Sequence, residues 1–369
     1  MFAFLLLRRR TSKWTLRSSS SSSSTNFSFY LRRTLRSKAV LETLIGVSSN
    51  NKTPPRNLVL YNYPSFSGAF SALFAHLHHS RLGLPHLIIP FSSVVPLRVK
   101  DLIFEGLETC YLLDFIGSDG FAAQLSRFVP KVIAFDHRKC TRAKISKKER
   151  NLENLELHID TERCSARSVY NYFSMQGKVT ELLEGEVCDR MRKIVDYVED
   201  GDLQRWALPD VKAFNAGIKE ERERLNCVAN PYLFDELMEM DADILIAKGN
   251  SYICSRREAA KKLLHELFRL RLGRGVYGEC LGMRVDGNSD LSHEIGEELS
   301  IRSREAGLRP IGAVIFKQRR SLKMCLRSTD NGTDTSEIAK AYGGGGSSAS
   351  SSFIIGMDEY NQWRSMKSS

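Results

Sequence analysis

The hydrophobic and polar positions of this chain fall first into a series of short apolar runs separated by helical patterns. Runs that fit buried strands occur at Leu58–Tyr61, Leu87–Phe91, Cys110–Asp114, Val132–Phe135 and Leu155–Ile159. Helical patterns lie between them, at Gly68–His79 and Asp119–Phe128. Strands that alternate with helices at this spacing predict a parallel α/β sheet with ligands at the carboxyl ends of its strands.

The stretch from about Arg163 to Leu272 has a mainly helical pattern. Ser255–Leu272 is the clearest case, because Ser255 and Glu258 form a capping box at its start. One apolar stripe follows, made of Ala260, Leu263, Leu264, Leu267 and Phe268. Gly273 is expected to end this helix. We therefore predict a helical connector in the middle of the chain.

A second strand–helix unit begins near Val276. Strands are predicted at Glu279–Val285, Ile311–Lys317 and Leu322–Leu326, and helices at Ser289–Ala306 and Ser336–Tyr342. The predicted organisation is a transit peptide (1–45), a linker (46–56), an α/β domain (57–205), a helical connector (206–274), a smaller C-terminal α/β domain (275–358) and a tail (359–369).

The net charge of +11 is concentrated at the N-terminus. The first 41 residues contain nine Lys or Arg, no Asp or Glu, and the serine run 18–24. This composition is typical of an organelle transit peptide. The alternative is a secretory signal, since Phe2–Leu7 is apolar, but that run is too short and its charges follow it. Arginine is dense from the start, which favours the mitochondrion over the chloroplast.

The rest of the chain is nearly neutral, with 45 basic and 43 acidic residues. Its overall charge therefore does not indicate nucleic-acid binding. The eight cysteines are scattered without a C-x-x-C pair, which argues against a zinc cage and against a disulfide framework. No later stretch approaches the ~20 apolar residues of a membrane span.

The segment after residue 322 carries the most informative pattern. A strand delivers Arg327 and Ser328, a short helix follows, and the helix runs into Gly343, Gly344, Gly345 and Gly346, with Ser347 next. Glycine allows backbone to approach a ligand closely, and successive free N–H groups can bind phosphate. The order strand, arginine, helix and glycine run therefore predicts a pocket for an anion.

This ordered series closely resembles the C-terminal substrate-binding domain of the DHH phosphoesterase family, in which Gly-Gly-Gly is followed by a His. Ser347 stands in the place of that His. The resemblance extends from Asn57 to Phe353 and suggests a plant-like organellar member of the superfamily. It implies a parallel α/β domain, a smaller C-terminal domain and a cleft between them. It also implies that Arg327, Ser328 and the glycine run contact substrate phosphate.

The resemblance further implies a metal site. Phe135-Asp136-His137-Arg138 follows a buried strand, where the family has its Asp-His-His. Asp114, His137 and Asp202 match ligands of one of the family's two metals, typically manganese, and Asp136 matches a residue that supports the loop. Arg138 takes the place of a His that contacts substrate phosphate. Taken singly, Asp114 and Asp202 also suit helix caps and His137 suits a loop.

The first motif departs from the family pattern. The family has a His followed by an acidic pair that ends in Asp-Gly, whereas this chain has Asn62, Ser65 and Ser67 before Gly68. Asn and Ser are weak neutral ligands, so one metal loses nearly all its side chains. The other keeps three, which predicts one weak Mn²⁺ site or none.

Three functions remain open at this stage. The first is a metal-dependent hydrolase of phosphoester bonds, such as a phosphodiesterase or oligoribonuclease. The second is a protein that binds a nucleotide or short oligonucleotide with little or no hydrolysis. The third is a structural partner of an organellar complex. A homo-oligomer is a further possible assembly. The altered first motif disfavours hydrolysis, and the retained Arg327, Ser328 and glycine run favour the second function over the third.

Overall fold

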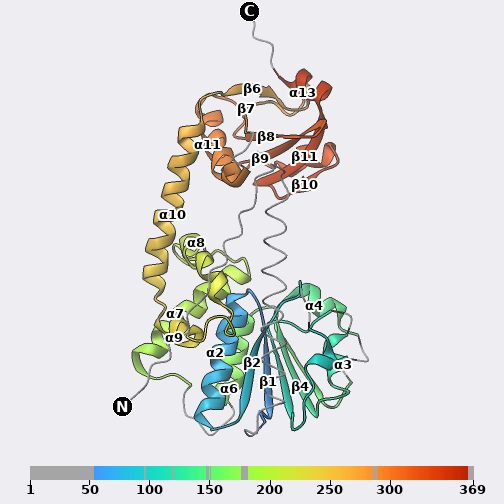
Figure 1. Cartoon of the computed structure of the whole chain (residues 1–369). Coiled ribbons are helices and arrows are strands. Elements are labelled where there is room, and N and C mark those ends of the chain that lie inside the picture. The colour runs from blue at the N-terminus through green and yellow to red at the C-terminus, as the bar shows by residue number, and fades with distance from the viewer. Residues whose placement is uncertain are drawn as a thin grey trace, which may run out of the picture. The chain divides into compact units, whose positions relative to one another are not determined.

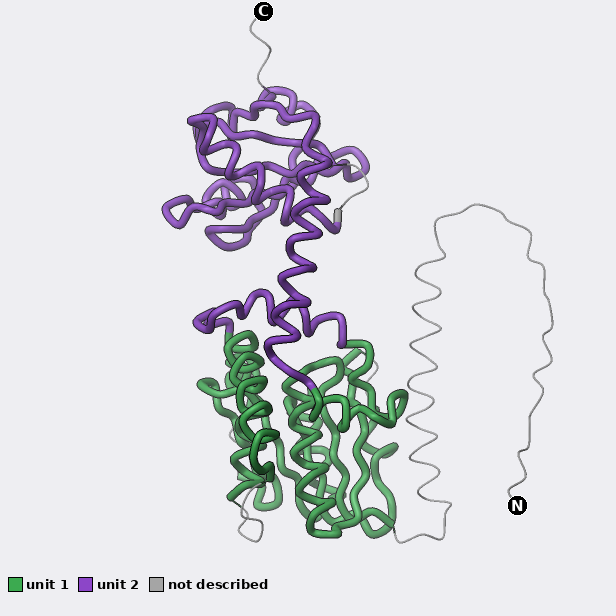
Figure 2. The backbone as a smooth tube through the Cα atoms, turned by 90° about the vertical axis from the view of Figure 1, so that its left-hand side faces the viewer, with its two compact units in different colours: residues 1–203, 222–239 green, residues 204–221, 240–369 purple. Residues whose placement is uncertain are grey.

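The computed structural model describes two compact units. The described residues are 54–94, 97–118, 120–146, 149, 151–175, 182–285 and 289–364. The predicted transit peptide and most of the predicted linker therefore lie outside the described residues. Unit 1 contains the chain up to Leu203 and residues 222–239, and unit 2 contains residues 204–221 and the chain from Met240 onward (Figure 2). The predicted helical connector is thus shared between the two units.

Unit 1 is built on a five-stranded sheet in which every pair of neighbouring strands is parallel. The strand order is β2-β1-β3-β4-β5 (Figure 1). The strands are β1 (Asn57–Asn62), β2 (His86–Phe91), β3 (Thr109–Leu113), β4 (Lys131–Asp136) and β5 (Leu155–Ile159). The predicted parallel α/β sheet is confirmed, strand by strand.

Alternating side chains of each strand pack against helices on opposite faces of this sheet. On β3, Leu112 belongs to a core shared with Phe121 and Leu125 of helix α3 (Phe121–Leu125). Its neighbour Tyr111 contacts Phe173 of helix α6 (Ser165–Met175) on the other face, with ring centroids 5.6 Å apart. Helix α2 (Phe66–Arg81) lies on the α6 side (Figure 1).

Three further helices complete the described part of unit 1: α4 (Lys139–Lys144), α7 (Gly185–Asp202) and α9 (Leu233–Glu239). Helix α3 is shorter than predicted at both ends, and its start is set by Gly120, which has a left-handed backbone with φ of 71°. The winding of the sheet reverses between β1 and β3. In sheets of this order, ligands bind beyond the carboxyl ends of the strands at that reversal.

Unit 2 contains a six-stranded mixed sheet of order β10-β11-β9-β8-β7-β6. Only the pair β7–β8 is parallel. The strands are β6 (Phe268–Arg271), β7 (Glu279–Arg284), β8 (Gly312–Gln318), β9 (Ser321–Arg327), β10 (Gly345–Gly346) and β11 (Ser350–Gly356). The helices are α8 (Val211–Lys219), α10 (Ala242–Leu263), α11 (Ser292–Glu305), α12 (Ser336–Ala341) and α13 (Met357–Trp363).

The prediction of a helix over Ser255–Leu272 is wrong at both ends. Helix α10 begins after Asp241, whose side chain accepts hydrogen bonds from the N–H groups of Asp243 and Ile244. It ends at Leu263, and Phe268–Arg271 instead forms edge strand β6, which pairs with β7. Ser255 therefore lies inside a helix, where no cap is required. The apolar stripe continued past the helix end because β6 also buries alternate side chains.

The two faces of the unit 2 sheet are covered by different helices. Met324 and Leu326 of β9 pack in the core that contains α12 and α13, and this core includes the fully buried Trp363. Residues 357–363 therefore belong to the folded unit, and the tail is shorter than predicted. Cys325 packs on the opposite face with α11. Because side chains alternate along a strand, Lys323 and Arg327 share the α11 face with Cys325.

Helices α8 and α10 of unit 2 cross at two glycines. A Cβ atom on Gly217 would lie 2.0 Å from the carbonyl oxygen of Leu245, and one on Gly249 would lie 1.8 Å from that of Ala213. Only glycine allows the two backbones to come this close. The crossing fixes α8 on α10 even though 22 residues separate these helices in the chain.

Two expectations about the whole chain can be compared with the described residues. All eight cysteines are free, as expected from their spacing. Among the described helices, none is both long enough and apolar enough to cross a membrane.

Candidate functional site

A cluster of polar side chains lies at the carboxyl edge of the unit 1 sheet, centred on Asp114. Asp114 follows β3 directly, has a left-handed backbone with φ of 67°, and its side chain is fully buried. Aspartate tolerates this conformation better than most residues. The left-handed turn places the carboxylate at the edge of the sheet, beside residues from the ends of β1 and β4.

Five neighbours, including Arg138 described below, donate hydrogen bonds to the Asp114 carboxylate or form ion pairs with it from other elements. Oδ2 accepts from Ser65 Oγ at 2.6 Å and from Asn62 Nδ2 at 2.9 Å. Oδ1 accepts from Ser165 Oγ at 2.9 Å and lies 3.2 Å from His137 Nδ1. The lone pairs of a buried carboxylate are therefore already used by donors of this chain.

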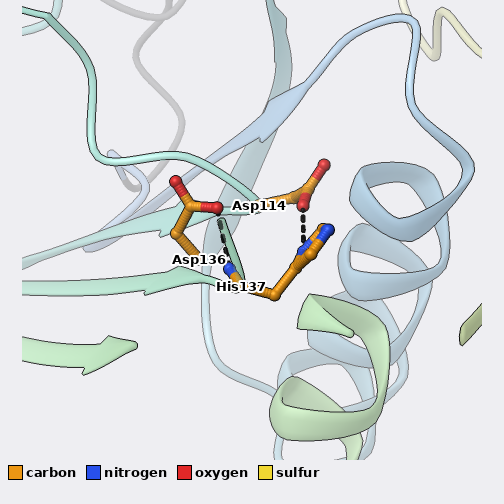
Figure 3. A group of neighbouring side chains, drawn as sticks. All are labelled: Asp114, Asp136 and His137. Carbon is orange, nitrogen blue, oxygen red and sulfur yellow. Dashed lines mark hydrogen bonds and ion pairs between the residues drawn. The ribbon is translucent and has the colours of Figure 1, made fainter. Parts of the chain in front are cut away.

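Asp136 and His137 complete the group shown in Figure 3. Asp136 Oδ1 accepts from the backbone N–H of His137 at 2.7 Å, and Oδ2 accepts from Thr141 Oγ1 at 2.7 Å. Candidate ligand atoms of Asp114, Asp136 and His137 lie within 4.8 Å of one another. These three buried residues form the only such group among the residues that the structure describes.

Arg138 connects the two carboxylates. Its Nη1 donates to Asp136 Oδ1 at 2.9 Å and to the backbone oxygen of Asp114 at 2.8 Å. Its Nη2 lies 3.3 Å from Asp114 Oδ2. Arg138 precedes α4, so the start of that helix positions the guanidinium over both acids.

These contacts determine the charges in the cluster. Burial alone would oppose ionisation of Asp114, but the hydrogen bond from His137 and the charge of Arg138 hold the pKa of its carboxyl at about 2. Burial also opposes protonation of His137, yet its pKa is raised because the imidazole faces the Asp114 carboxylate. Asp114 is therefore ionised around neutral pH, and the guanidinium of Arg138 compensates its charge.

Two residues of the predicted site make no direct contact with Asp114. Asp202 is the last residue of α7 and is exposed to solvent. Partial burial of its carboxyl and the nearby charge of Asp114 still raise its pKa, so it lies within electrostatic reach of the cluster. Ser67 is fully buried in α2, and its Oγ accepts the N–H of Ala166 instead of contacting Asp114.

The donor set does not fit two metal ions. Asn62 and Ser65 direct hydrogens at Asp114, whereas metal ligands must offer lone pairs. Ser67 is occupied elsewhere, and Arg138 adds a permanent positive charge between the carboxylates that would bind a cation. Asp114, Asp136 and His137 could hold one ion only after Arg138 moved. We therefore derive no hydrolytic step from a metal pair at this site.

A cavity of about 680 Å³ adjoins the cluster. Arg138, Thr141 and Lys144 line one part of it, and apolar residues that include Phe91 and Phe115 line another. The rings of Phe91 and Phe115 stack with centroids 4.4 Å apart. Its lining contains both acidic and basic side chains, including Asp136 and Glu149, so it has no clear charge preference.

A second cavity, of about 510 Å³, lies within unit 2 beside the ends of β8, β9 and β11. Three basic residues line it, namely Lys317, Lys323 and Arg327, and its described lining contains no acidic residue. Arg327 packs over Gly296 of α11, and its Nη1 donates to the backbone oxygen of Leu326. Its Nε is buried without a hydrogen-bond partner in the described structure.

The glycine run contributes to this cavity only in part. Gly345 and Gly346 form β10 and line the cavity, whereas Gly343 and Gly344 do not. The N–H groups of Gly343 and Gly344 donate to Lys340 and Ala339 at the end of α12. The expected concavity of four free N–H groups is therefore not formed. A Cβ atom on Gly344 would lie 2.2 Å from the oxygen of Ser352, so this glycine is required by packing.

Comparisons with known proteins give structural matches alone. No family model and no curated protein matches this chain. It is similar in structure to the pGpG-specific phosphodiesterase PggH of Vibrio cholerae, with 12% identity, a TM-score of 0.41, and coverage of 83% of this chain and 95% of that chain. CDC45 from Entamoeba histolytica matches with 12% identity, a TM-score of 0.35, and coverage of 88% and 97%. RecJ from Thermus thermophilus in complex with Mn²⁺ matches with 12% identity, a TM-score of 0.37, and coverage of 88% and 53%. At these scores we draw no argument about activity from the matches.

The structure assigns the remaining predicted residues to structural contacts and adds new ones. Ser328 Oγ donates to the backbone oxygen of Pro310, and Ser347 closes a turn with Ser350, so neither lines the unit 2 cavity. Lys317 and Lys323 were not predicted as site residues. The alternation along β9 could have identified Lys323, since it lies four residues before Arg327 on the same face.

Proposed function

We propose that this chain is a DHH phosphoesterase-like protein that binds the phosphates of a nucleotide or short oligonucleotide in the unit 2 cavity, with little or no hydrolysis. The observation that carries the proposal is the described lining of that cavity, which contains Lys317, Lys323 and Arg327 and no acidic residue. Charge-assisted hydrogen bonds from Arg and Lys are well suited to phosphate oxygens.

Two further features of the cavity support an anionic ligand. Ser292, the first residue of α11, lines it, so the positive end of a 14-residue helix adds to the potential there. The buried Nε of Arg327 lacks a partner, and an unpaired buried donor is costly. A turn of the guanidinium that exposes Nε to the cavity would let a phosphate oxygen accept its hydrogen bond. None of these groups requires a metal ion.

Weak or absent hydrolysis follows from the unit 1 cluster. A two-metal mechanism needs a second set of ligands, and the corresponding residues are Asn62, Ser65 and Ser67. We propose at most one weakly bound Mn²⁺ in unit 1, with Asp136 replacing the predicted Asp202 beside Asp114 and His137. An active manganese-dependent hydrolase remains the alternative, and the composition of the first 41 residues leads us to propose a mitochondrial location.

The test is equilibrium binding of a fluorescently labelled short oligoadenylate in the presence of a chelator. We expect wild-type protein to bind and Arg327→Ala to lower the affinity by about 1.5–3 kcal/mol, the usual scale for a hydrogen bond to a charged group. This corresponds to roughly ten- to 150-fold in the dissociation constant. Arg269→Ala is the matched control, because Arg269 is an exposed arginine on β6 of the same unit and outside the cavity.

The outcomes separate the three functions. Equal affinities of wild type and Arg327→Ala, or no binding by either, would favour a structural role in an organellar complex. Cleavage of the oligoadenylate by wild-type protein after addition of Mn²⁺ would favour the hydrolase.

A further inference from the structure

The two carboxylates at the carboxyl edge of the unit 1 sheet already share a cation. Asp114 follows β3, Asp136 ends the neighbouring strand β4, and the side chains of both are almost completely buried. The guanidinium of Arg138 lies 2.9 Å from Asp136 Oδ1 and 3.3 Å from Asp114 Oδ2. Its position between two buried acids is one that a divalent cation would otherwise occupy.

We infer that Arg138 is an internal cation that takes the place of a metal ion and excludes it. A metal bound to the same two oxygens would lie next to a permanent positive charge, since arginine does not lose its proton in proteins. The ion could enter only after the guanidinium left both carboxylates. Arg138 and a divalent cation therefore compete for Asp114 and Asp136.

The hydrogen bonds of Arg138 hold its guanidinium in a fixed position, unlike those of an exposed ion pair at the surface. Nη1 also donates to the backbone oxygen of Asp114 at 2.8 Å, so the side chain is held by three acceptors. Asp136 accepts the backbone N–H of Arg138 as well, which holds the residue in position before α4. The planar fork of arginine suits this bidentate arrangement, and a lysine would not reproduce it.

The competition has a measurable consequence. Only the small fraction of molecules in which Arg138 has left both carboxylates can bind the metal. The apparent metal affinity is therefore the intrinsic affinity multiplied by that fraction. Removing the side chain removes this penalty and leaves two buried carboxylates without a counter-charge. The variant should therefore bind Mn²⁺ more tightly than the wild type and should depend on it for stability. This inference does not rest on phosphate binding in unit 2.

The experiment titrates MnCl₂ into wild type, Arg138→Ala and Arg142→Ala, using calorimetry and the electron paramagnetic resonance signal of free Mn²⁺. Arg142 is an exposed arginine of α4, the helix that follows Arg138, and serves as the control. We expect one site in Arg138→Ala, with an affinity about tenfold or more above that of wild type and Arg142→Ala. Without metal, Arg138→Ala should melt at a lower temperature, and Mn²⁺ should raise that temperature selectively.

Two further variants keep the inference falsifiable. If Arg138→Ala does not fold, Arg138→Gln removes the charge while keeping a hydrogen-bond donor, and the same gain in Mn²⁺ affinity is expected. Adding Asp114→Asn to the Arg138 variant should abolish the gain, because Asp114 is the shared carboxylate. Equal Mn²⁺ affinity in wild type and the Arg138 variants, no binding in any of them, or a gain that survives Asp114→Asn would overturn the inference.

Discussion

Acid should destabilise unit 1 through a buried histidine of helix α2. His79 is 1% exposed, and its Nδ1 lies 2.7 Å from the backbone oxygen of Ala75. The rings of Tyr111, Phe173 and His86 surround it, with centroids 5.3 to 5.7 Å away. Burial, with a smaller contribution from neighbouring histidines, lowers the pKa of His79 from 6.5 to about 4, although the bond to Ala75 opposes the shift.

The direction of the effect follows from proton binding. Above pH 6.5 the imidazole is neutral in both the folded and unfolded states, so it does not make the free energy of unfolding depend on pH. Between pH 6.5 and pH 4 the unfolded state binds a proton that the folded state does not, so stability is lost as the pH falls. Below pH 4 both states are protonated and the loss is complete. A shift of this size corresponds to about 3 kcal/mol.

The assay compares wild type with His79→Phe, which keeps a ring among its aromatic neighbours but cannot titrate. Urea unfolding followed by far-UV circular dichroism gives the free energy of unfolding at each pH, taken from the transition that the His79 substitution shifts. His79→Phe loses the hydrogen bond to Ala75 and should be the less stable protein at pH 7.5. The stability advantage of wild type should shrink by about 3 kcal/mol between pH 6.5 and pH 4.

The difference between the two proteins isolates His79 from the other groups that titrate in this range. These include His76 and His78 of the same helix, whose pKa values are also lowered by burial. A difference in stability that stays constant from pH 7.5 to pH 4 would refute the reasoning. It would mean that the folded state accepts a proton at His79 without cost.

Two other features give separate predictions. Gly217→Ala should lower the stability of unit 2 by about 1–3 kcal/mol, the usual cost of overpacking, since its Cβ atom would meet the oxygen of Leu245; thermal melting of the variant measures this. Deleting residues 1–45 should leave a folded protein that stays in the cytosol as a fluorescent fusion, because those residues have the composition of a transit peptide; unchanged organellar fluorescence would contradict this.

The fold was predictable where local pattern and tertiary packing agree. The five strands of unit 1 are short apolar runs bounded by turns, and the same runs form the strands of the parallel sheet. The agreement fails between Leu263 and Phe268. Leucines with helical spacing occur there on both sides of a helix end, and nothing local shows that Leu264 leaves the helical conformation. The pairing of β6 with β7, which determines the outcome, is a tertiary contact.

The candidate site was predictable in its residue types but not in its contacts. The sequence identifies Asp114, Asp136 and Arg138 as neighbours of strand ends. It does not show that Arg138 turns back onto Asp114, 24 residues earlier, because that contact depends on the pairing of β3 with β4. The glycine run was identified by composition, yet hydrogen bonds at the end of α12 use two of its four N–H groups.

The interleaving of the two units along the chain has a consequence for synthesis on the ribosome. Unit 1 is incomplete until residue 239 has emerged, because residues 222–239 belong to it. Within this segment the backbone oxygen of Leu225 accepts a hydrogen bond from the buried hydroxyl of Tyr61 in β1. Helix α8 emerges before residue 222, but its partner α10 follows only after residue 241. During that interval the nascent chain carries the glycine face of α8 without helix α10, which packs against it. A chaperone that acts on this protein during translation would encounter α8 as its first exposed apolar helix of unit 2.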